Sequence, residues 1–386
     1  MPSSDRRGGK SPRWPKVLVA CVSVLITTTV VVAAAEVYLR LTRAHVNADT
    51  LRAKSLEYEA TLFSRYAFPQ MLQRKHATPS GDVVINPRGY RGQLFAIPKP
   101  PGTVRVVMLG GSSLFDMYAK EGQDWPHLIE SNLRSRGYGN VEVINAGTPG
   151  HATPDFLGRF YSEIWMFEPD YLLVYESWND IKYFHRLDPQ HSLLRLWRPA
   201  RVDGHGSGYL LSNPFMYYSG WSDRLLSRSQ IYVRLRDLYL QWRIGRPRVE
   251  GIVTSSNLHN DYSDYGPRQF ALNLHLLAAA ARHVGAKPIL LTQARLVTPS
   301  NTPAEREQIA YEFVNLSHEA LLRAFADCDT AILSVARANS VPVLDLSRMF
   351  SGQSALFEDH VHTTTAGSNA LALATADFLQ TMLRKP

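Results

Sequence analysis

The sequence contains little cysteine, and this limits the kinds of fold and site that it can build. Cys21 and Cys328 are the two cysteines in 386 residues, and Cys21 lies inside a long apolar run. The rest of the chain therefore cannot close a disulfide within itself. Neither cysteine belongs to a CxxC motif or to a Cys/His cluster with the spacing of metal ligands. An oxidising compartment is permitted by this composition but is not indicated by it.

Other features that would define a function are also missing. The net charge is +8, but the body of the chain has no dense run of Lys and Arg interleaved with aromatics, so nucleic-acid binding is not expected. There is no internal repeat and no low-complexity tract. Hydrophobic residues make up 45% of the sequence, which is too high a share for a disordered protein. Part of the basic excess lies in residues 1–16, which we interpret as a cytoplasmic tail.

One long stretch carries no charge at all, from Val17 to Ala35. As a helix rising about 1.5 Å per residue it would span roughly 28 Å, close to the hydrocarbon thickness of a bilayer. Residues 17–39 are therefore predicted to be a transmembrane anchor and the contact of this chain with a membrane. A signal peptide cleaved near Ala35 is the alternative. The basic tail predicts a single-pass protein whose body lies on the extracytoplasmic side.

The remaining sequence divides into a stalk and an α/β region. Residues 40–102 are predicted to be a juxtamembrane stalk and linker, helical over 40–80 and turn-rich over 86–92. From 103 to 386, short apolar strands alternate with helices, which predicts a parallel sheet covered on both faces. The strands are predicted at 104–109, 141–144, 171–175, 288–292 and 341–345, and the helices at 125–136, 153–167, 270–284, 304–338 and 365–383.

Residues 185–265 interrupt the alternation and are rich in Trp and Tyr. We interpret them as one insertion between the third strand and the helix that returns from it. Their aromatic side chains could line a groove for an acyl group or a glycan. Packing over the edge of the sheet would account for them equally well.

Four short polar motifs stand near the predicted strand ends. The first motif, Gly110-Gly111-Ser112-Ser113, is not the GxSxG elbow of the α/β-hydrolases. It is also not a P-loop, because no Gly-Lys-Ser/Thr sequence follows. The carboxyl ends of parallel strands meet at one edge of a sheet, so a site is expected there. The motifs are Gly110-Gly111-Ser112-Ser113, Asn145-Ala146-Gly147-Thr148-Pro149-Gly150, Ser177-Trp178-Asn179-Asp180 and Asp359-His360-Val361-His362.

The last motif has the spacing of an acid–base pair. In a tight turn the carboxylate of Asp359 can reach Nδ1 of His362, which leaves Nε2 to take a proton from a serine. Asn179 could donate to a developing oxyanion, although a helix cap explains it equally well when it is taken alone. The pair His360 and His362 could suggest a metal. No third ligand with coherent spacing is visible, so neither a metal nor another cofactor is expected.

The order of the four motifs resembles that of the SGNH hydrolases, also called GDSL-type esterases and lipases. Their Gly-Asp-Ser block is matched by Gly110-Gly111-Ser112, with glycine in place of Asp. Their Gly-x-Asn-Asp block is matched by Asn179-Asp180, with Ser177 in place of glycine, and their Asp-x-x-His block by Asp359 and His362. The resemblance covers residues 103–383. The segment 86–91 after a single anchor is similar to bacterial membrane-anchored members.

This resemblance implies an SGNH, flavodoxin-like three-layer sandwich and a serine hydrolase of ester bonds, with residues 103–386 as its hydrolase domain. Ser112, rather than Ser113, would be the nucleophile, with Asp359 and His362 as the other members of a triad. The N–H groups of Ser112 and Gly150 and the side chain of Asn179 would form the oxyanion hole. The implied substrate is a small-molecule or glycan ester.

Two alternatives to hydrolysis stay open at this stage. An O-acyltransferase acting on envelope polysaccharide would use the same serine chemistry and would differ only in the acceptor of the acyl group. A non-catalytic SGNH-like scaffold would bind glycan without turnover. The presence of Ser112, Asp359 and His362 argues against the scaffold, because a retired site would be free to lose them.

Overall fold

The computed structural model describes residues 14–42, 74–192, 226, 229–232, 234–235 and 258–383. The chain divides into two compact units. Residues 1–55 and 213–246 form the first unit, and residues 56–212 and 247–386 form the second. Most of the predicted insertion at 185–265, like residues 43–73 of the predicted stalk, lies outside the described residues.

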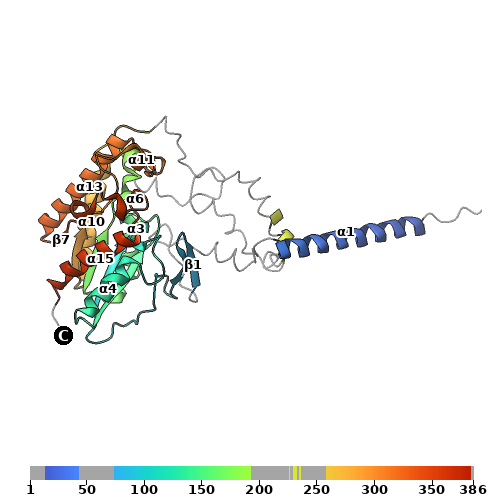
Figure 1. Cartoon of the computed structure of the whole chain (residues 1–386), viewed down its shortest axis with the longest axis horizontal. Coiled ribbons are helices and arrows are strands. Elements are labelled where there is room, and N and C mark those ends of the chain that lie inside the picture. The colour runs from blue at the N-terminus through green and yellow to red at the C-terminus, as the bar shows by residue number, and fades with distance from the viewer. Residues whose placement is uncertain are drawn as a thin grey trace, which may run out of the picture. The chain divides into compact units, whose positions relative to one another are not determined.

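In the first unit the main described element is helix α1 (Trp14–Thr42), coloured blue in Figure 1. Its stretch Leu18–Leu41 has a mean hydropathy of 2.5 and is long enough to cross a membrane. A signal sequence near the N-terminus has the same properties, so the helix does not decide between an anchor and a cleaved signal. Near the end of α1, the carboxylate of Glu36 accepts the backbone N–H groups of Gln230 at 2.9 Å and Ile231 at 3.0 Å. Part of the predicted insertion thus contacts α1.

The second unit is built on a five-stranded parallel sheet with the order β4-β3-β5-β6-β7. The chain adds β4 on one side of β3 and then β5 on the other, so a topological switch point lies beside β3, where open α/β sheets bind ligands. Gly110 at the end of β3 pairs with Gly147 of β4 and Tyr175 of β5. The strands are β3 (Val104–Gly110), β4 (Val141–Gly147), β5 (Tyr171–Tyr175), β6 (Lys287–Leu291) and β7 (Val343–Leu344).

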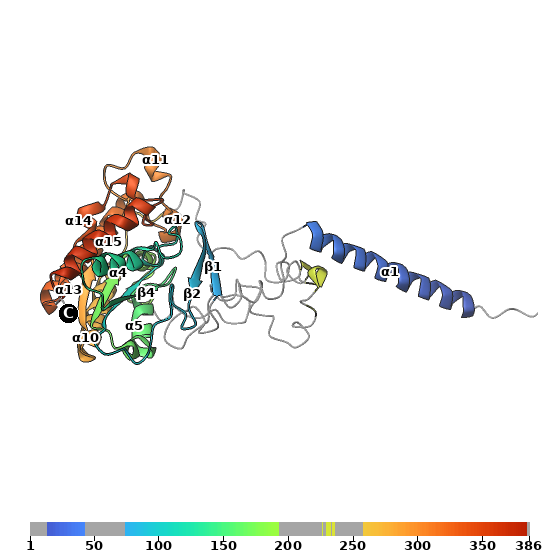
Figure 2. The same cartoon turned by 60° about the horizontal axis from the view of Figure 1, so that its bottom comes forward.

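Helices cover both faces of this sheet, as Figures 1 and 2 show. The predicted three-layer α/β sandwich with a central parallel sheet is therefore confirmed. One face carries α4 (Trp125–Ser135) and α15 (Thr365–Gln380), and the other carries α5 (Thr153–Ser162), α10 (Tyr265–His283) and α13 (His318–Asn339).

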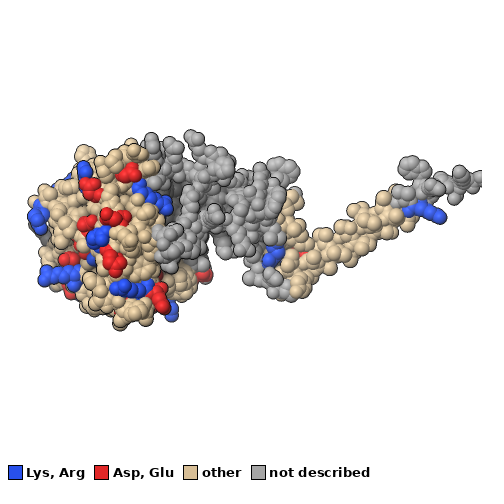
Figure 3. Space-filling view, turned by 90° about the horizontal axis from the view of Figure 1, so that it is seen from above, with Lys and Arg blue, Asp and Glu red and all other residues tan. Residues whose placement is uncertain are grey.

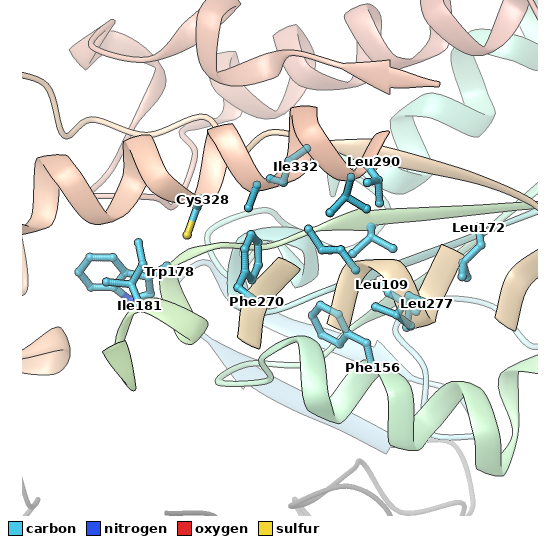
Figure 4. Packing of buried hydrophobic residues seen from close by; sticks show 14 of the residues in the cluster. Leu109, Phe156, Leu172, Trp178, Ile181, Phe270, Leu277, Leu290, Cys328 and Ile332 are labelled. Atoms are coloured by element: carbon cyan, nitrogen blue, oxygen red, sulfur yellow. The ribbon is translucent and has the colours of Figure 1, made fainter. Parts of the chain in front are cut away.

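Successive residues of β3 point to opposite faces of the sheet, as the pleat of a strand requires. Val106 and Met108 belong to the buried cluster under α4 and α15, whereas Val107 and Leu109 belong to the cluster under α5, α10 and α13. Figure 4 shows part of the second cluster, with Leu109 close to Leu277 of α10. Burial on both faces explains why these strands are continuously apolar rather than alternating.

Two long helices predicted from the sequence are interrupted in the structure, so those predictions were wrong. The helix predicted over 153–167 ends at Ser162, and the 3₁₀ turn η1 (Ile164–Phe167) follows. The helix predicted over 304–338 is three helices, α11 (Pro303–Arg306), α12 (Tyr311–Val314) and α13. Asn315 has a φ of 56°, which ends α12, and the hydroxyl of Ser317 then caps α13 by accepting the N–H of Ala320. A side chain that caps a new helix competes with continuation of the old one.

The described end of the predicted helical stalk is also not helical. Residues 74–78 form β1 (Arg74–Thr78), which pairs antiparallel with β2 (Gly81–Ile85). The predicted turns follow, with the N–H of Gly89 bonded to the carbonyl of Asn86. Ile85 and Val83 pack on Phe115 of the sheet unit.

The other short helices of the sheet unit lie in loops between these elements. They are α3 (Ser112–Phe115), α6 (Trp178–Ile181), η2 (Phe184–Arg186), α14 (Leu346–Phe350) and η5 (Ser354–Leu356). On the face seen in Figure 3, Lys and Arg are interspersed with Asp and Glu over the described surface of this unit, and no large area of one sign is visible.

Candidate active site

Ser112 begins α3 directly after β3, and two glycines allow it to stand at the edge of the sheet. A methyl group at Gly110 would overlap the side chain of Leu114, and one at Gly111 would overlap Asn179 and Glu176. Glycine at both positions therefore lets Leu114, Asn179 and Glu176 pack directly against the backbone that leads to Ser112. Ser112 is 9% exposed, so its hydroxyl lies in a mostly enclosed position.

The two adjacent serines have different partners. The Oγ of Ser112 lies 2.7 Å from Nε2 of His362. The Oγ of Ser113 instead accepts a hydrogen bond of 2.8 Å from Nε2 of Gln293. Of these two serines, Ser112 is therefore the one in contact with an imidazole.

Asp359 and His362 form a tight turn at the start of the segment leading to α15. The Oδ2 of Asp359 lies 2.7 Å from Nδ1 of His362. Its Oδ1 accepts the backbone N–H groups of Val361 and His362, both at 3.0 Å. The carboxylate is thus held by its own turn and holds the imidazole in turn, so Ser112, His362 and Asp359 form one hydrogen-bonded chain.

The pKa of Asp359 reflects this arrangement. Burial alone would raise the pKa, but the hydrogen bond and the charge of His362, followed by His360 and the N–H of Val361, hold it well below its usual range. Asp359 therefore stays ionised throughout the neutral range and favours a proton on Nδ1 of His362. Nε2 is then left to accept a hydrogen bond from the hydroxyl of Ser112.

Asn179 lies in α6, just after β5, and its amide is close to the nucleophile. Its Nδ2 donates to the carbonyl of His151 at 2.8 Å and lies 3.2 Å from Oε2 of Glu176. The overlap of a methyl at Gly111 with this amide places it beside the peptide that precedes Ser112. The structure thus brings Asn179 next to the predicted nucleophile, with both of its amide hydrogens directed at protein oxygens.

Gly150 lies in the turn after β4. Its φ of 78° is in the left-handed region that favours glycine. It precedes His151, whose carbonyl accepts from Asn179 and whose N–H donates to Thr148. The predicted oxyanion glycine is therefore next in sequence to a residue that contacts Asn179.

Glu176 belongs to the site but was not found by sequence reasoning. Its Oε1 accepts the N–H groups of Ser177 at 3.0 Å and Asn179 at 2.9 Å. Burial, and then the charge of Asp180, raise its pKa to about 8. A carboxyl inside an apolar strand end, directly before the Ser177-Asn179 motif, was the sequence signal that could have identified it.

A second buried acid, Asp116, also went unnoticed in the sequence. Its carboxyl accepts the hydroxyls of Thr363 at 3.2 Å and Ser368 at 2.7 Å, and the N–H of Trp125 at 3.0 Å. Burial raises its pKa to about 7. Because Thr363 follows His362 and Asp116 follows α3, this acid joins the loop that carries the nucleophile to the loop that carries the base.

Arg91 also bonds to the loop that follows the nucleophile. Its guanidinium is buried, donates to four backbone carbonyls and pairs with Asp124 at 3.2 Å. The turn-rich segment before the sheet is thus part of the support of the site. The four carbonyls belong to Phe115, Asp116, Ala119 and Lys120.

One group of side chains has the composition of a metal site. Ligand atoms of Asp359, His360 and His362 lie within 4.8 Å of one another. Sequence reasoning found no third ligand beside the two histidines, and the structure places Asp359 there. However, Asp359 and His362 already bond to each other. A metal could bind these three residues only by breaking the contact that orients His362.

No protein-family profile and no curated protein sequence matches this chain. Solved structures that align with it include a lipase/acylhydrolase from Enterococcus faecalis, 16% identical, covering 74% of this chain and 99% of that chain with a TM-score of 0.42. The acetylxylan esterase Axe2 from Geobacillus stearothermophilus is 13% identical, with 73% and 95% covered and a TM-score of 0.40. A GDSL-like lipase from Bacteroides thetaiotaomicron is 14% identical, with 75% and 93% covered and a TM-score of 0.40. At these values the likeness does not assign an activity to this chain.

Proposed function

We propose that this protein is an SGNH-type serine hydrolase that cleaves carboxylic esters and is anchored to a membrane by α1. The observation that carries the proposal is the hydrogen-bonded chain from Ser112 through His362 to Asp359, with 2.7 Å at each of its two links. A hydroxyl, an imidazole and a carboxylate in this order are the parts needed to activate a serine as a nucleophile.

In the proposed reaction, Oγ of Ser112 attacks the ester carbonyl while Nε2 of His362 takes its proton. The tetrahedral intermediate collapses as His362 gives that proton to the leaving alcohol, which leaves an acyl group on Ser112. Water, deprotonated by His362, then attacks the acyl carbonyl and releases the acid. Asp359 holds the imidazole in place and stabilises its positive charge in both halves of the cycle.

The oxyanion of each intermediate needs donors next to Ser112. We assign this role to the backbone N–H groups of Ser112 and Gly150 and to the amide of Asn179. Removal of one such donor from a serine hydrolase typically lowers kcat about 10²–10³-fold. The close approach of Asn179 to the peptide before Ser112 supports its place in this set.

We also propose that the sheet unit lies on the extracytoplasmic side of the membrane, where envelope glycans or lipids would supply its esters. The support is the sequence of α1, whose apolar stretch follows a basic N-terminal segment. A cysteine introduced at an exposed position such as Ser135 would test this side in intact cells. Labelling by a membrane-impermeant maleimide is expected, and labelling only after lysis would place the unit inside.

The test of the proposed function is covalent labelling of the full chain in detergent by a fluorophosphonate probe, with turnover of p-nitrophenyl acetate in parallel. Ser112→Ala is expected to abolish labelling and to lower turnover by at least about 10⁴. Ser113→Ala is the matched control, because it removes a neighbouring hydroxyl that bonds to Gln293, and it should retain labelling. Absence of labelling in a folded wild-type protein would favour a glycan-binding scaffold instead.

A further inference from the structure

Both hydrogens of the Asn179 amide already face protein acceptors. Its Nδ2 carries two hydrogens, and in the structure they face the carbonyl of His151 at 2.8 Å and Oε2 of Glu176 at 3.2 Å. The oxyanion of the proposed reaction would be a third acceptor. Catalysis through Asn179 therefore requires one of the two present acceptors to release its hydrogen.

Glu176 is the acceptor whose hydrogen bonding changes with its protonation state. The carbonyl of His151 accepts in every protonation state. Oε2 of Glu176 is a strong, charged acceptor when the carboxyl is ionised and only a weak acceptor when it carries the proton of the neutral form. Its other oxygen is already occupied by the N–H groups of Ser177 and Asn179. The exchangeable proton of the acid form thus belongs on Oε2, the oxygen that faces Asn179.

The carboxyl of Glu176 also lies where a change in its protonation would affect the surroundings of Ser112. Oε2 lies against Gly111 so closely that a methyl group there would overlap it together with Nδ2 of Asn179. Gly111 is joined directly to the N–H of Ser112, the first proposed oxyanion donor. Glu176 and Asn179 therefore share the space beside the peptide that the oxyanion would approach.

We propose that Glu176 is a positioning residue that controls Asn179: the neutral carboxyl leaves one amide hydrogen for the oxyanion, and the ionised carboxyl takes it. This inference rests on the proposed function and adds to it a limit on activity at alkaline pH. Loss of one oxyanion donor lowers kcat about 10²–10³-fold, and that is the largest fall that ionisation of Glu176 could produce.

The surroundings of Glu176 support a neutral carboxyl at neutral pH. Glu176 is 2% exposed, and no Lys or Arg among the described residues forms an ion pair with it. Burial, and next the nearby charge of Asp180, raise its pKa to about 8. An acid with this pKa gives up its proton within the range in which an esterase can be assayed.

Other titratable groups pack around this loop from neighbouring elements. Tyr175 ends β5, and burial raises the pKa of its hydroxyl. Cys328 of α13 contacts Ser177, and burial raises the pKa of its thiol well above the usual value. Asp180 accepts the hydroxyl of Thr153 at 2.5 Å and its N–H at 2.9 Å. His151 contributes its backbone carbonyl to the loop. Glu176 is thus the acid of this loop whose pKa lies near 8.

The experiment measures kcat and KM for p-nitrophenyl acetate between about pH 6 and 10, using the full chain in detergent and subtracting spontaneous hydrolysis. Wild type is expected to lose kcat with one ionisation near pH 8 while KM changes little. Glu176→Gln keeps an oxygen for the two backbone N–H groups and places a permanent donor toward Asn179. It should lack this fall and keep kcat within about tenfold of wild type at pH 7. The same fall in Glu176→Gln would overturn the proposal.

Asn179→Ala provides a second and independent arm. It should have low kcat at every pH, without the alkaline fall, and adding Glu176→Gln to it should change kcat little, because the two residues act through one amide. An alkaline fall that persists in Asn179→Ala would contradict the proposal even if Glu176→Gln does not fold. Glu319→Gln, an exposed acid on α13, is the control and should retain the wild-type profile. Turnover that does not depend on Ser112 would instead refute the proposed function.

Discussion

Two short loops meet at Ser112, and they are built in opposite ways. The turn of residues 359–362 supplies its own partners, since Asp359 bonds to backbone and side-chain nitrogens within three residues of itself. The loop of residues 176–179 also has local bonds, because Oε1 of Glu176 accepts two N–H groups of the same loop, but distant residues complete it. Its amide bonds to His151, its carboxyl fills the space beside Gly111, and the N–H of Trp178 donates to Gln293 at 2.9 Å. The local turn of residues 359–362 depends on few other residues, whereas the assembled loop of residues 176–179 depends on every element that contacts it.

The two acids of these loops also differ in charge. Asp359 faces an imidazole and two N–H groups, which hold its pKa well below the usual range. Glu176 accepts only from uncharged donors in a more enclosed position, and burial raises its pKa to about 8. The comparison teaches that partner charge and burial, rather than the carboxyl itself, decide which acid is a permanent anion at this site.

Asp359→Asn is expected to disrupt the local turn of residues 359–362 most strongly. The backbone N–H groups of Val361 and His362 would keep the amide oxygen, so the NH₂ group would face Nδ1 of His362. The imidazole would then carry its proton on Nε2 and could not accept one from Ser112. We expect kcat to fall about 10⁴-fold, measured as p-nitrophenyl acetate turnover.

The matched control for this change is Glu358→Gln, at the exposed acid that directly precedes Asp359. Its kcat should remain within about threefold of wild type. An Asp359→Asn variant that retains more than about a tenth of wild-type kcat would show that the turn does not orient the base.

The assembled loop is broken most directly by Asn179→Ala, which removes the proposed side-chain donor to the oxyanion. Because two backbone donors would remain, the expected loss of kcat at pH 7 is smaller, about 10²–10³-fold, with KM nearly unchanged. Asn369→Ala on the exposed side of α15 controls for loss of an amide as such. Unchanged kcat in a folded Asn179→Ala variant would remove Asn179 from the oxyanion hole.

Gly111→Ala separates the two loops without deleting any functional group. The atoms nearest to the added methyl would be the amide of Asn179, the carboxyl of Glu176 and the carbonyl of His151, all outside the turn of residues 359–362. A shift of a catalytic group by about 1 Å costs about 10² in rate.

Steady-state kinetics and thermal melting together measure this effect. Gly139→Ala is the control, since a methyl there meets no atom within 4 Å, and it should behave as wild type. Wild-type kcat in Gly111→Ala would mean that the close packing of the assembled loop does not matter for the reaction.

The smallest expected effect concerns Asp116, the buried acid that joins the loop of Ser112 to the loop of His362, and it appears in stability rather than in rate. Its pKa is raised to about 7 in the folded protein from an ordinary 3.8. Between about pH 4 and 7 the unfolded chain therefore binds fewer protons than the folded one, and the free energy of unfolding falls as the pH rises. One such group contributes at most about 1.4 kcal/mol per pH unit.

Asp116→Asn should remove this part of the decline, because an amide can accept the N–H of Trp125 and donate to Thr363. Denaturant unfolding at a series of pH values would measure it. The variant is expected to gain on wild type from pH 5 to pH 7 by about 1–2 kcal/mol. A difference between the two proteins that does not change with pH would contradict the raised pKa.

The same contrast explains what could be predicted from the sequence. Strands such as 104–109 and 171–175 were identified because burial on both faces makes them continuously apolar, and Asp359 and His362 because their spacing is local. Glu176 was missed because its meaning depends on Gly111, which lies 65 positions earlier. The helix predicted over 304–338 was wrong because apolar periodicity continues through residues 309–316, although Asn315 ends one helix and Ser317 begins the next.

The buried guanidinium of Arg91 has a practical consequence for making a soluble form of this protein. It supplies donors to four carbonyls of residues 115–120 and neutralises Asp124 in a position closed to water. A recombinant fragment that starts at the first strand of the sheet would leave these carbonyls without their donor and Asp124 with His127 as its remaining ion-pair partner. Each buried acceptor left unsatisfied typically costs about 1–3 kcal/mol. Deletion of the apolar helix should therefore stop before residue 74, so that the hairpin and the arginine stay with the nucleophile that they support.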